Sequence, residues 1–225
     1  MTIEEALIEF GRELICPPNE WYKWRKINPR FLPEGVSVSG GNSYFQNESL
    51  KKQLSEQYWL GTDERKIEIT RYYIAVWGGV RRNRPEKIRG YALNPPSSLI
   101  EGGVSGVASW SKALCIRDPN RYAIYDARVS VSLNALQIIY SVQDPVLFPL
   151  LVGQNKLINK GSDLLIFNAC QKAWGRVSEA SFYNMYNALL EKVACSLKVE
   201  HYTVEMALFA KALELLKSAF PKENF

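Results

Sequence analysis

The sequence predicts a mainly α-helical protein. Apolar residues recur with the 3.6-residue period of a helix in four long stretches: after Thr2, over residues 69–80, after Ser181 and before Pro221. Only residues 36–39, where valine and serine alternate, favour a short strand. The sequence has no internal repeat of the kind that builds solenoids or propellers.

Capping residues and helix breakers set the expected ends of these helices. Ser181 is a candidate N-cap of the third helix, and the last is expected to begin at Thr203 and stop before Pro221. Stripes this regular are typical of helix faces that pack in a core. The inward residues are Ile3, Ala6, Leu7, Phe10 and Leu14 in the first stripe; Ile69, Tyr72, Tyr73, Val76 and Val80 in the second; Phe182, Met185, Tyr186, Leu189, Leu190, Val193 and Leu197 in the third; and Val204, Ala207, Leu208, Leu215 and Leu216 in the fourth.

Length and composition are those of a globular protein. The 225 residues are 47% hydrophobic and 23% charged, and no sharp change in composition divides them, so we expect a single compact helical unit over residues 1–225. No apolar run approaches the roughly 20 residues of a membrane-spanning helix. Glu4 and Glu5 stand where a signal peptide needs basic residues. The expected location is cytoplasmic, with no membrane partner.

Several kinds of chemistry are excluded by what the sequence lacks. Cys16, Cys115, Cys170 and Cys195 are too dispersed for a paired metal motif, and His201 is the single histidine. We therefore predict no metal site and expect the cysteines to be buried free thiols. Neither a phosphate-binding P-loop nor a dinucleotide fingerprint is present. No cofactor is predicted.

Two segments are rich in basic residues, and the first also interleaves them with aromatic ones. Such patterns suit nucleic acid, because cations attract phosphates and aromatic rings stack on bases. The net charge is +5. The alternatives are a half-buried segment with solvated charges in the first case and charges that complement a helix C-terminus in the second. The residues are Trp21, Tyr22, Lys23, Trp24, Arg25, Lys26, Arg30 and Phe31 in the first segment and Arg81, Arg82, Arg84, Lys87 and Arg89 in the second.

The most informative segment runs from Gly106 to Val129. Small residues at 106–108 predict a turn, residues 109–114 suit the start of a helix, and Asp118-Pro119-Asn120 breaks the chain. An apolar run then leads to Asp126, which is an acceptable N-cap for a helix that places Val129, Leu133, Leu136 and Tyr140 on one side. This order predicts that a cation or an aromatic residue of the first helix lies near a carboxylate.

This segment resembles the helix-hairpin-helix DNA glycosylase superfamily, and in particular bacterial proteins similar to 8-oxoguanine glycosylase. The hairpin aligns with Gly106-Val107-Ala108, the catalytic aspartate with Asp126, and the polar residue two positions later with Arg128. The resemblance covers about two dozen residues. It implies two helical lobes around a central cleft, with the hairpin and the catalytic aspartate in residues 100–140.

The resemblance also implies an activity on double-stranded DNA, in which a damaged or modified base is flipped out and excised. Asp126 would stabilise the sugar cation, and Lys112 would be a Schiff-base nucleophile. The hairpin backbone and nearby arginines would bind phosphates. The implied DNA-binding residues are Gly106, Val107, Ala108, Ser109, Trp110 and Arg128, and Arg117 and Arg121 flank the loop between the helices.

Two questions stay open at this level. A strict alignment puts Trp110, not Lys112, in the position of the lysine, and two positions along a helix differ by about 200° in direction, so only one of them faces Asp126. With water in place of the amine, the product would be an intact strand with an abasic site. The alternative to an enzyme is a DNA-binding module without catalysis, because the third hairpin residue is Ala108 instead of glycine. Repair of damaged DNA and attack on a modified invading genome would use the same apparatus, and the sequence determines neither the base nor the oligomeric state.

Overall fold

The computed structural model describes residues 1–14, 21–24, 27–38 and 40–225, and in this part the chain is mainly helical. The only strands among the described residues are two of two residues each. The elements are α1 (Ile3–Leu14), η1 (Pro29–Phe31), α2 (Ser43–Leu60), α3 (Asp63–Arg71), η2 (Tyr72–Trp77), α4 (Pro85–Leu93), α5 (Pro96–Ile100), α6 (Val107–Arg117), α7 (Ala127–Ile139), β1 (Val146–Leu147), α8 (Lys156–Gln171), β2 (Gly175–Arg176), α9 (Phe182–Leu197) and α10 (His201–Ala219).

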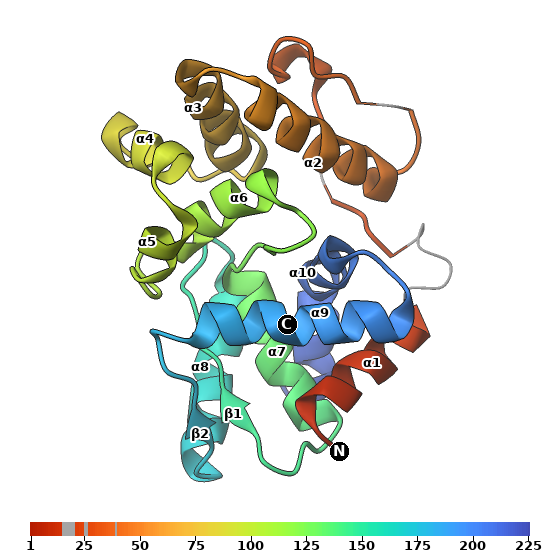
Figure 1. Cartoon of the computed structure of the whole chain (residues 1–225). Coiled ribbons are helices and arrows are strands. Elements are labelled where there is room, and N and C mark those ends of the chain that lie inside the picture. Colours follow the sequence, from red (N-terminus) through yellow and green to blue (C-terminus); the bar gives the residue numbers. More distant parts are fainter. Residues whose placement is uncertain (15–20, 25–26, 39) are drawn as a thin grey trace.

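The helices form two groups (Figure 1). The α7 group contains α1, α7, α8, α9 and α10, and the α2 group contains α2, α3, η2 and α4. Helix α6 lies between them and contributes a face to each: Trp110 and Leu114 belong to the core of the α7 group, whereas Cys115 and Ile116 belong to the core of the α2 group. The segment singled out from the sequence therefore lies at the junction of the two groups.

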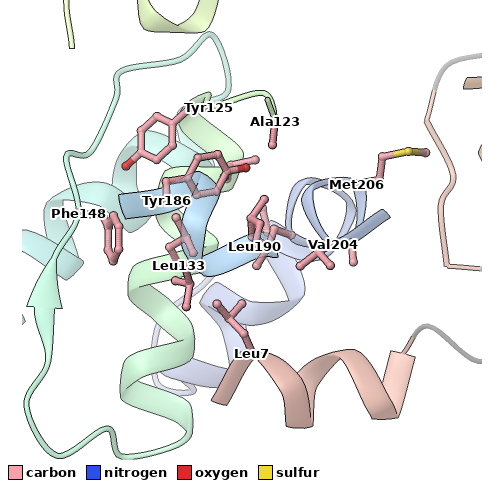
Figure 2. Packing of buried hydrophobic residues seen from close by; sticks show 14 of the residues in the cluster. Leu7, Ala123, Tyr125, Leu133, Phe148, Tyr186, Leu190, Val204 and Met206 are labelled. Carbon is pink, nitrogen blue, oxygen red and sulfur yellow. The ribbon is translucent and has the colours of Figure 1, made fainter. Parts of the chain in front are cut away.

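Helix α7 is the centre of its group. Residues 129–137 are all buried, because α1, α8 and α10 pack against the helix and Leu133 also reaches the side chains of α9. Leu133 of α7 packs among Leu7, Tyr186 and Leu190 (Figure 2). Close packing on all sides fixes the axis of α7. The residue at its N-terminus is therefore also fixed in position.

Polar side chains of α7 hold the chain that follows it. Asn134 donates to the carbonyl of Phe148 at 3.1 Å and accepts from its N–H at 3.0 Å. Gln137 forms the same pair of bonds with Val146, at 2.8 Å each. Each amide side chain thus satisfies a backbone donor and acceptor that burial would otherwise leave unpaired. They place β1, which pairs in parallel with β2.

Three polar contacts join the α2 group to the start of α10. The hydroxyl groups of Tyr44 and Thr203 are 2.7 Å apart, and the hydroxyl of Tyr202 donates to Glu48 at 2.8 Å. One turn further along α2, Lys51 forms a buried ion pair with Glu205. These contacts supplement the shared helix α6 as a connection between the groups.

The first stripe lies on α1, and the inward residues of the fourth are buried in α10, which begins at His201, two residues before the predicted start. The third stripe lies on α9 and is buried except at Met185, which is exposed, and Leu197, which is partly buried. The second stripe is not one helix, because α3 ends at Arg71 and the chain continues as a π-helix. Ser181 stands at the N-cap position, but its side chain makes no capping bond.

The predicted strand at residues 36–39 is wrong in its described part, residues 36–38. Both backbone groups of Ser37 bond to the side chain of Gln53 in α2, so they are not available to a sheet. Ser39 lies outside the described residues.

The expectation of buried thiols is correct only for Cys115. Cys170 and Cys195 are exposed, because each lies on the outward side of its helix. Cys16 lies outside the described residues.

Candidate functional site

Asp126 is the N-cap of α7, as predicted. Its backbone is extended, and its Oδ1 accepts hydrogen bonds from the N–H groups of Arg128 at 2.9 Å and Val129 at 3.1 Å. These bonds satisfy two of the helix's unpaired donors, and the helix dipole favours a negative charge here by roughly 0.3–1 kcal/mol. The carboxylate is half-buried and held in one orientation.

Side chains from α9 fix the run that leads to Asp126. The hydroxyl groups of Tyr183 and Tyr186 donate to the carbonyls of Ala123 and Ile124, both at 2.9 Å. On the other side, the N–H of Tyr125 donates to Ser111 of α6 at 3.1 Å. Sequence reasoning treated Tyr186 as a purely apolar position. A tyrosine in a buried stripe needs a hydrogen-bond partner, and that need is the signal which was missed.

The turn before α6 has the backbone that its glycine permits. Gly106 has a φ of +71°, α6 begins at Val107, and Ala108 lies inside the helix with no positive φ. Two of the amides predicted to bind phosphate are bonded within the turn: Val107 donates to the carbonyl of Val104 at 3.3 Å and Ser109 to that of Gly106 at 2.8 Å. The hydroxyl of Ser109 accepts a hydrogen bond from Asn83 at 2.9 Å, which ties the basic segment at residues 81–84 to the start of α6.

Trp110 and Lys112 point to different groups of helices. The Trp110 indole is buried, meets the Tyr183 ring edge-on at 4.6 Å between centroids and donates to the carbonyl of Ser105 at 3.1 Å. Lys112 lies on the other side of α6, with its stem against Gly78 and its amine donating to the carbonyl of Ala108 at 2.7 Å.

Lys112 is buried, and carboxylates of opposite charge act on its amine. The side chain is almost fully buried, with 4% exposed. Burial lowers the pKa of its amine, and the Asp126 and Glu205 carboxylates oppose that shift. The buried Lys112 amine therefore loses its proton more readily than the amine of an exposed lysine, even though the two carboxylates favour its charged form.

Lys51 and Glu205 form a buried ion pair beside Lys112, with 2.8 Å between the amine and the carboxylate. Burial raises the pKa of Glu205 against the effect of Lys51. Burial acts to lower the pKa of Lys51, but the Glu205 carboxylate together with Cys115 and Tyr44 outweighs it, so that the pKa stands above its ordinary value. The Cys115 thiol lies in the same surroundings, and burial raises its pKa to about 11. Lys51, Lys112, Cys115 and Glu205 are called the buried polar cluster below.

Sequence reasoning missed the pair of Lys51 and Glu205. The available signal was local: Lys51 lies directly after the buried Leu50, and Glu205 lies among the inward residues of the last stripe. A charged residue on a core face needs a partner of opposite charge. The sequence could not say which partner, because 154 positions separate the two residues.

The arginines of the predicted site differ in whether their guanidinium groups are exposed enough to contact a phosphate. Arg128 is half-buried over the rings of Trp24, at 5.6 Å, and Phe209, at 5.2 Å. The predicted phosphate contact of Arg117 is wrong for this structure, because its buried guanidinium donates to the carbonyls of Tyr91 and Asn94. Arg121 is exposed.

The aromatic residues expected to stack on a flipped base are mostly internal. Trp21 and Tyr22 belong to the core of the α7 group, and Trp24 packs edge-on against Phe209 at 4.6 Å between centroids. Arg25 and Lys26 of the same segment lie outside the described residues.

A pocket of about 420 Å³ lies elsewhere, between α3, η2 and α4. Asp126 and Lys112 are not among the residues that line it, which are Glu64, Ile67, Glu68, Arg71, Ala75, Val80, Arg81, Asn83, Pro85 and Ile88. The described residues contain no group of three histidine, cysteine or acidic side chains that could hold a metal ion.

Comparison with known proteins adds no family to this geometry. No protein-family model matches the sequence, and neither a curated protein nor a solved structure matches it. In the described part of the chain, none of the helices has the length and apolarity needed to cross a membrane.

Proposed function

We propose that the protein is a DNA glycosylase that excises a damaged or modified base. The observation that carries the proposal is that α6, with the buried amine of Lys112, is bonded through Ser111 to Tyr125, the residue before the capping carboxylate of Asp126. The fold that we propose with it is the two-lobed helix-hairpin-helix arrangement. The α2 and α7 groups would be the lobes, and α6 and Asp126 would lie at their junction.

Excision needs a fixed negative charge. As the bond between base and sugar breaks, its electron pair leaves with the base and positive charge builds up on C1′. The Asp126 carboxylate cannot turn away, because two backbone N–H groups hold it. A charge that is already oriented stabilises the transition state without reorganisation.

Lys112 would supply the nucleophile. Its unprotonated amine attacks C1′, the base departs with the electron pair of the broken bond and takes up a proton, and the sugar ring then opens to a Schiff base. The amine must first leave the Ala108 carbonyl, to which it donates in the free protein. If water attacks in its place, the strand stays intact, and this is the second branch.

DNA would approach over the start of α6. Arg81, Arg82 and Arg84 are exposed, and Asn83 anchors their segment to Ser109 beside the Gly106 turn. Cations beside a helix N-terminus suit a phosphate backbone, and such contacts position a duplex without reading its sequence. The target nucleotide must rotate out of the stack to bring its sugar to Asp126.

The proposal predicts a covalent intermediate that depends on Lys112. Duplexes carrying oxidised, alkylated, deaminated or phage-modified bases are incubated with the protein, and alkali-labile sites and borohydride-trapped adducts are measured. We expect both products with at least one duplex, and no trapped adduct from Lys112→Ala, because the reducible bond is made to its amine.

Lys52→Ala is the matched control. It removes a lysine whose side chain is 58% exposed in a surface pair with Glu48 and leaves Lys112 in place, so the adduct should form as in wild type. Excision without any adduct would assign the reaction to water. Binding to DNA with no product from any base would contradict an enzyme and favour a DNA-binding module.

A further inference from the structure

The stem of Lys112 lies directly against the backbone of Gly78, at the end of η2. A methyl group built on Gly78 would stand 2.7 Å from Cε and 2.9 Å from Cδ of Lys112. It would also stand 2.9 Å from the carbonyl oxygen of Ile74. Carbon atoms do not approach one another this closely in proteins, so the lysine stem occupies space that only a glycine leaves open.

Backbone hydrogen bonds hold this glycine in place. The N–H of Gly78 donates to Tyr73 at 3.0 Å, which continues the π-helix, and that of Val80 donates to Ile74 at 3.0 Å. Between them, Gly79 has a φ of +71°. This is the arrangement that ends a helix with a left-handed glycine. The π-helical turn therefore determines where the backbone of Gly78 lies relative to Lys112.

Side chains of the same turn anchor it to α2. The Trp77 ring stacks on Tyr73 with 4.3 Å between centroids and 10° between planes, and its indole N–H donates to Asn47 at 2.7 Å. A turn fixed on both sides cannot retreat to make room for a larger residue. A methyl group at position 78 would therefore displace the flexible stem of Lys112 and would also press on the Ile74 carbonyl of the fixed turn.

We infer that Gly78 is a positioning residue for Lys112: it leaves the space for the stem and so sets where the amine lies, at the Ala108 carbonyl. This inference rests on the proposed function for its catalytic meaning. Its physical content, that position 78 sets where the Lys112 amine lies, can be measured without DNA.

Two neighbouring glycines give a matched pair of variants. Gly78 has a φ of −80°, which alanine adopts readily, so Gly78→Ala acts through its new contacts with Lys112 and the turn. Gly79 has a left-handed φ, which alanine resists, but nothing lies within 4 Å of a methyl group there. Gly79→Ala therefore strains the backbone without touching Lys112.

The first readout is the titration of Lys112 in protein labelled with ¹³C-lysine, with its Cε resonance identified by its absence in Lys112→Ala. In Gly78→Ala we expect the titration to move towards that of an exposed lysine, since the displaced amine is less buried. Asp126, Glu205, Lys51 and Cys115, the charged and titratable groups that act on this amine, are present in both glycine variants. Gly79→Ala should titrate as wild type.

The second readout is the free energy of unfolding. Lys112→Ala removes the stem, so Gly78→Ala should cost less stability in that background than in wild type, whereas Gly79→Ala should cost the same in both. The third is the rate of borohydride-trapped adduct formation, which should fall about tenfold to a hundredfold in Gly78→Ala and less than about twofold in Gly79→Ala.

The outcomes separate this inference from the proposed function. If wild type forms no adduct with any duplex, the proposed function fails, but the titration and the stability measurements still decide the role of Gly78. An unchanged Lys112 titration in Gly78→Ala, with the same stability cost in both backgrounds, would overturn the inference even if wild type excises a base.

Discussion

Asp126→Asn is expected to slow base excision strongly and to leave the fold intact. Asparagine caps a helix as well as aspartate, so its side-chain oxygen can still accept from Arg128 and Val129. The negative charge is lost, and with it the stabilisation of the sugar cation. We expect the single-turnover rate of excision to fall on the order of a hundredfold to a thousandfold. Thermal unfolding should stay close to that of wild type.

The control for this variant is the cap of a helix in the other group. Thr62 caps α3 in the α2 group, where its hydroxyl accepts from the N–H of Arg65 at 3.4 Å. Thr62→Ala should cost about 1 kcal/mol of stability and leave excision unchanged. If Asp126→Asn excises at nearly the wild-type rate, Asp126 is a structural cap and nothing more.

Lys51→Met is expected to destabilise the protein by about 3–5 kcal/mol, because it leaves the Glu205 carboxylate buried without its partner. Chemical denaturation at neutral pH measures the effect. Replacing both residues, as in Lys51→Met with Glu205→Leu, should recover most of the loss, since an apolar pair of similar size needs no compensating charge.

The pH dependence of this variant gives a second check. Burial already raises the pKa of Glu205 above its unfolded value, and removal of the lysine raises it further. The protonated acid is the form that the folded state prefers, so Lys51→Met should be closest to wild type at acid pH. It should lose stability as the pH rises through the folded-state pKa.

Lys52 provides the matched control, because it is the next residue and its side chain is 58% exposed in a surface pair with Glu48. Lys52→Met should change stability by no more than about 1 kcal/mol. An equal effect of the two substitutions would show that the buried pair of Lys51 and Glu205 contributes no more than a surface contact.

Most periodic local patterns in the sequence predict the observed helices. The stripe behind Thr2 lies on α1, and the inward residues of the last stripe are buried in α10. The cap at Asp126 was also predictable, because capping depends on the residue and its near neighbours. A mainly helical chain follows from these local preferences.

Features that depend on distant contacts were not predictable. The stripe at residues 69–80 reads as one helix, but the chain becomes a π-helix there, where Trp77 stacks on Tyr73 and bonds to Asn47 in α2. Gly78 carries no local signal at all, since its role depends on a lysine 34 positions later. The same holds for the buried pair of Lys51 and Glu205.

The sharing of α6 between two cores has a consequence for how the protein can be divided. Trp110 and Leu114 belong to one core and Cys115 and Ile116 to the other, so a cut on either side of α6 would leave an apolar surface open to water. Neither group of helices would therefore have a closed core without α6. Helix α6, which carries the proposed nucleophile, therefore also joins the two cores. A substitution on either face of α6 changes the packing of one of them.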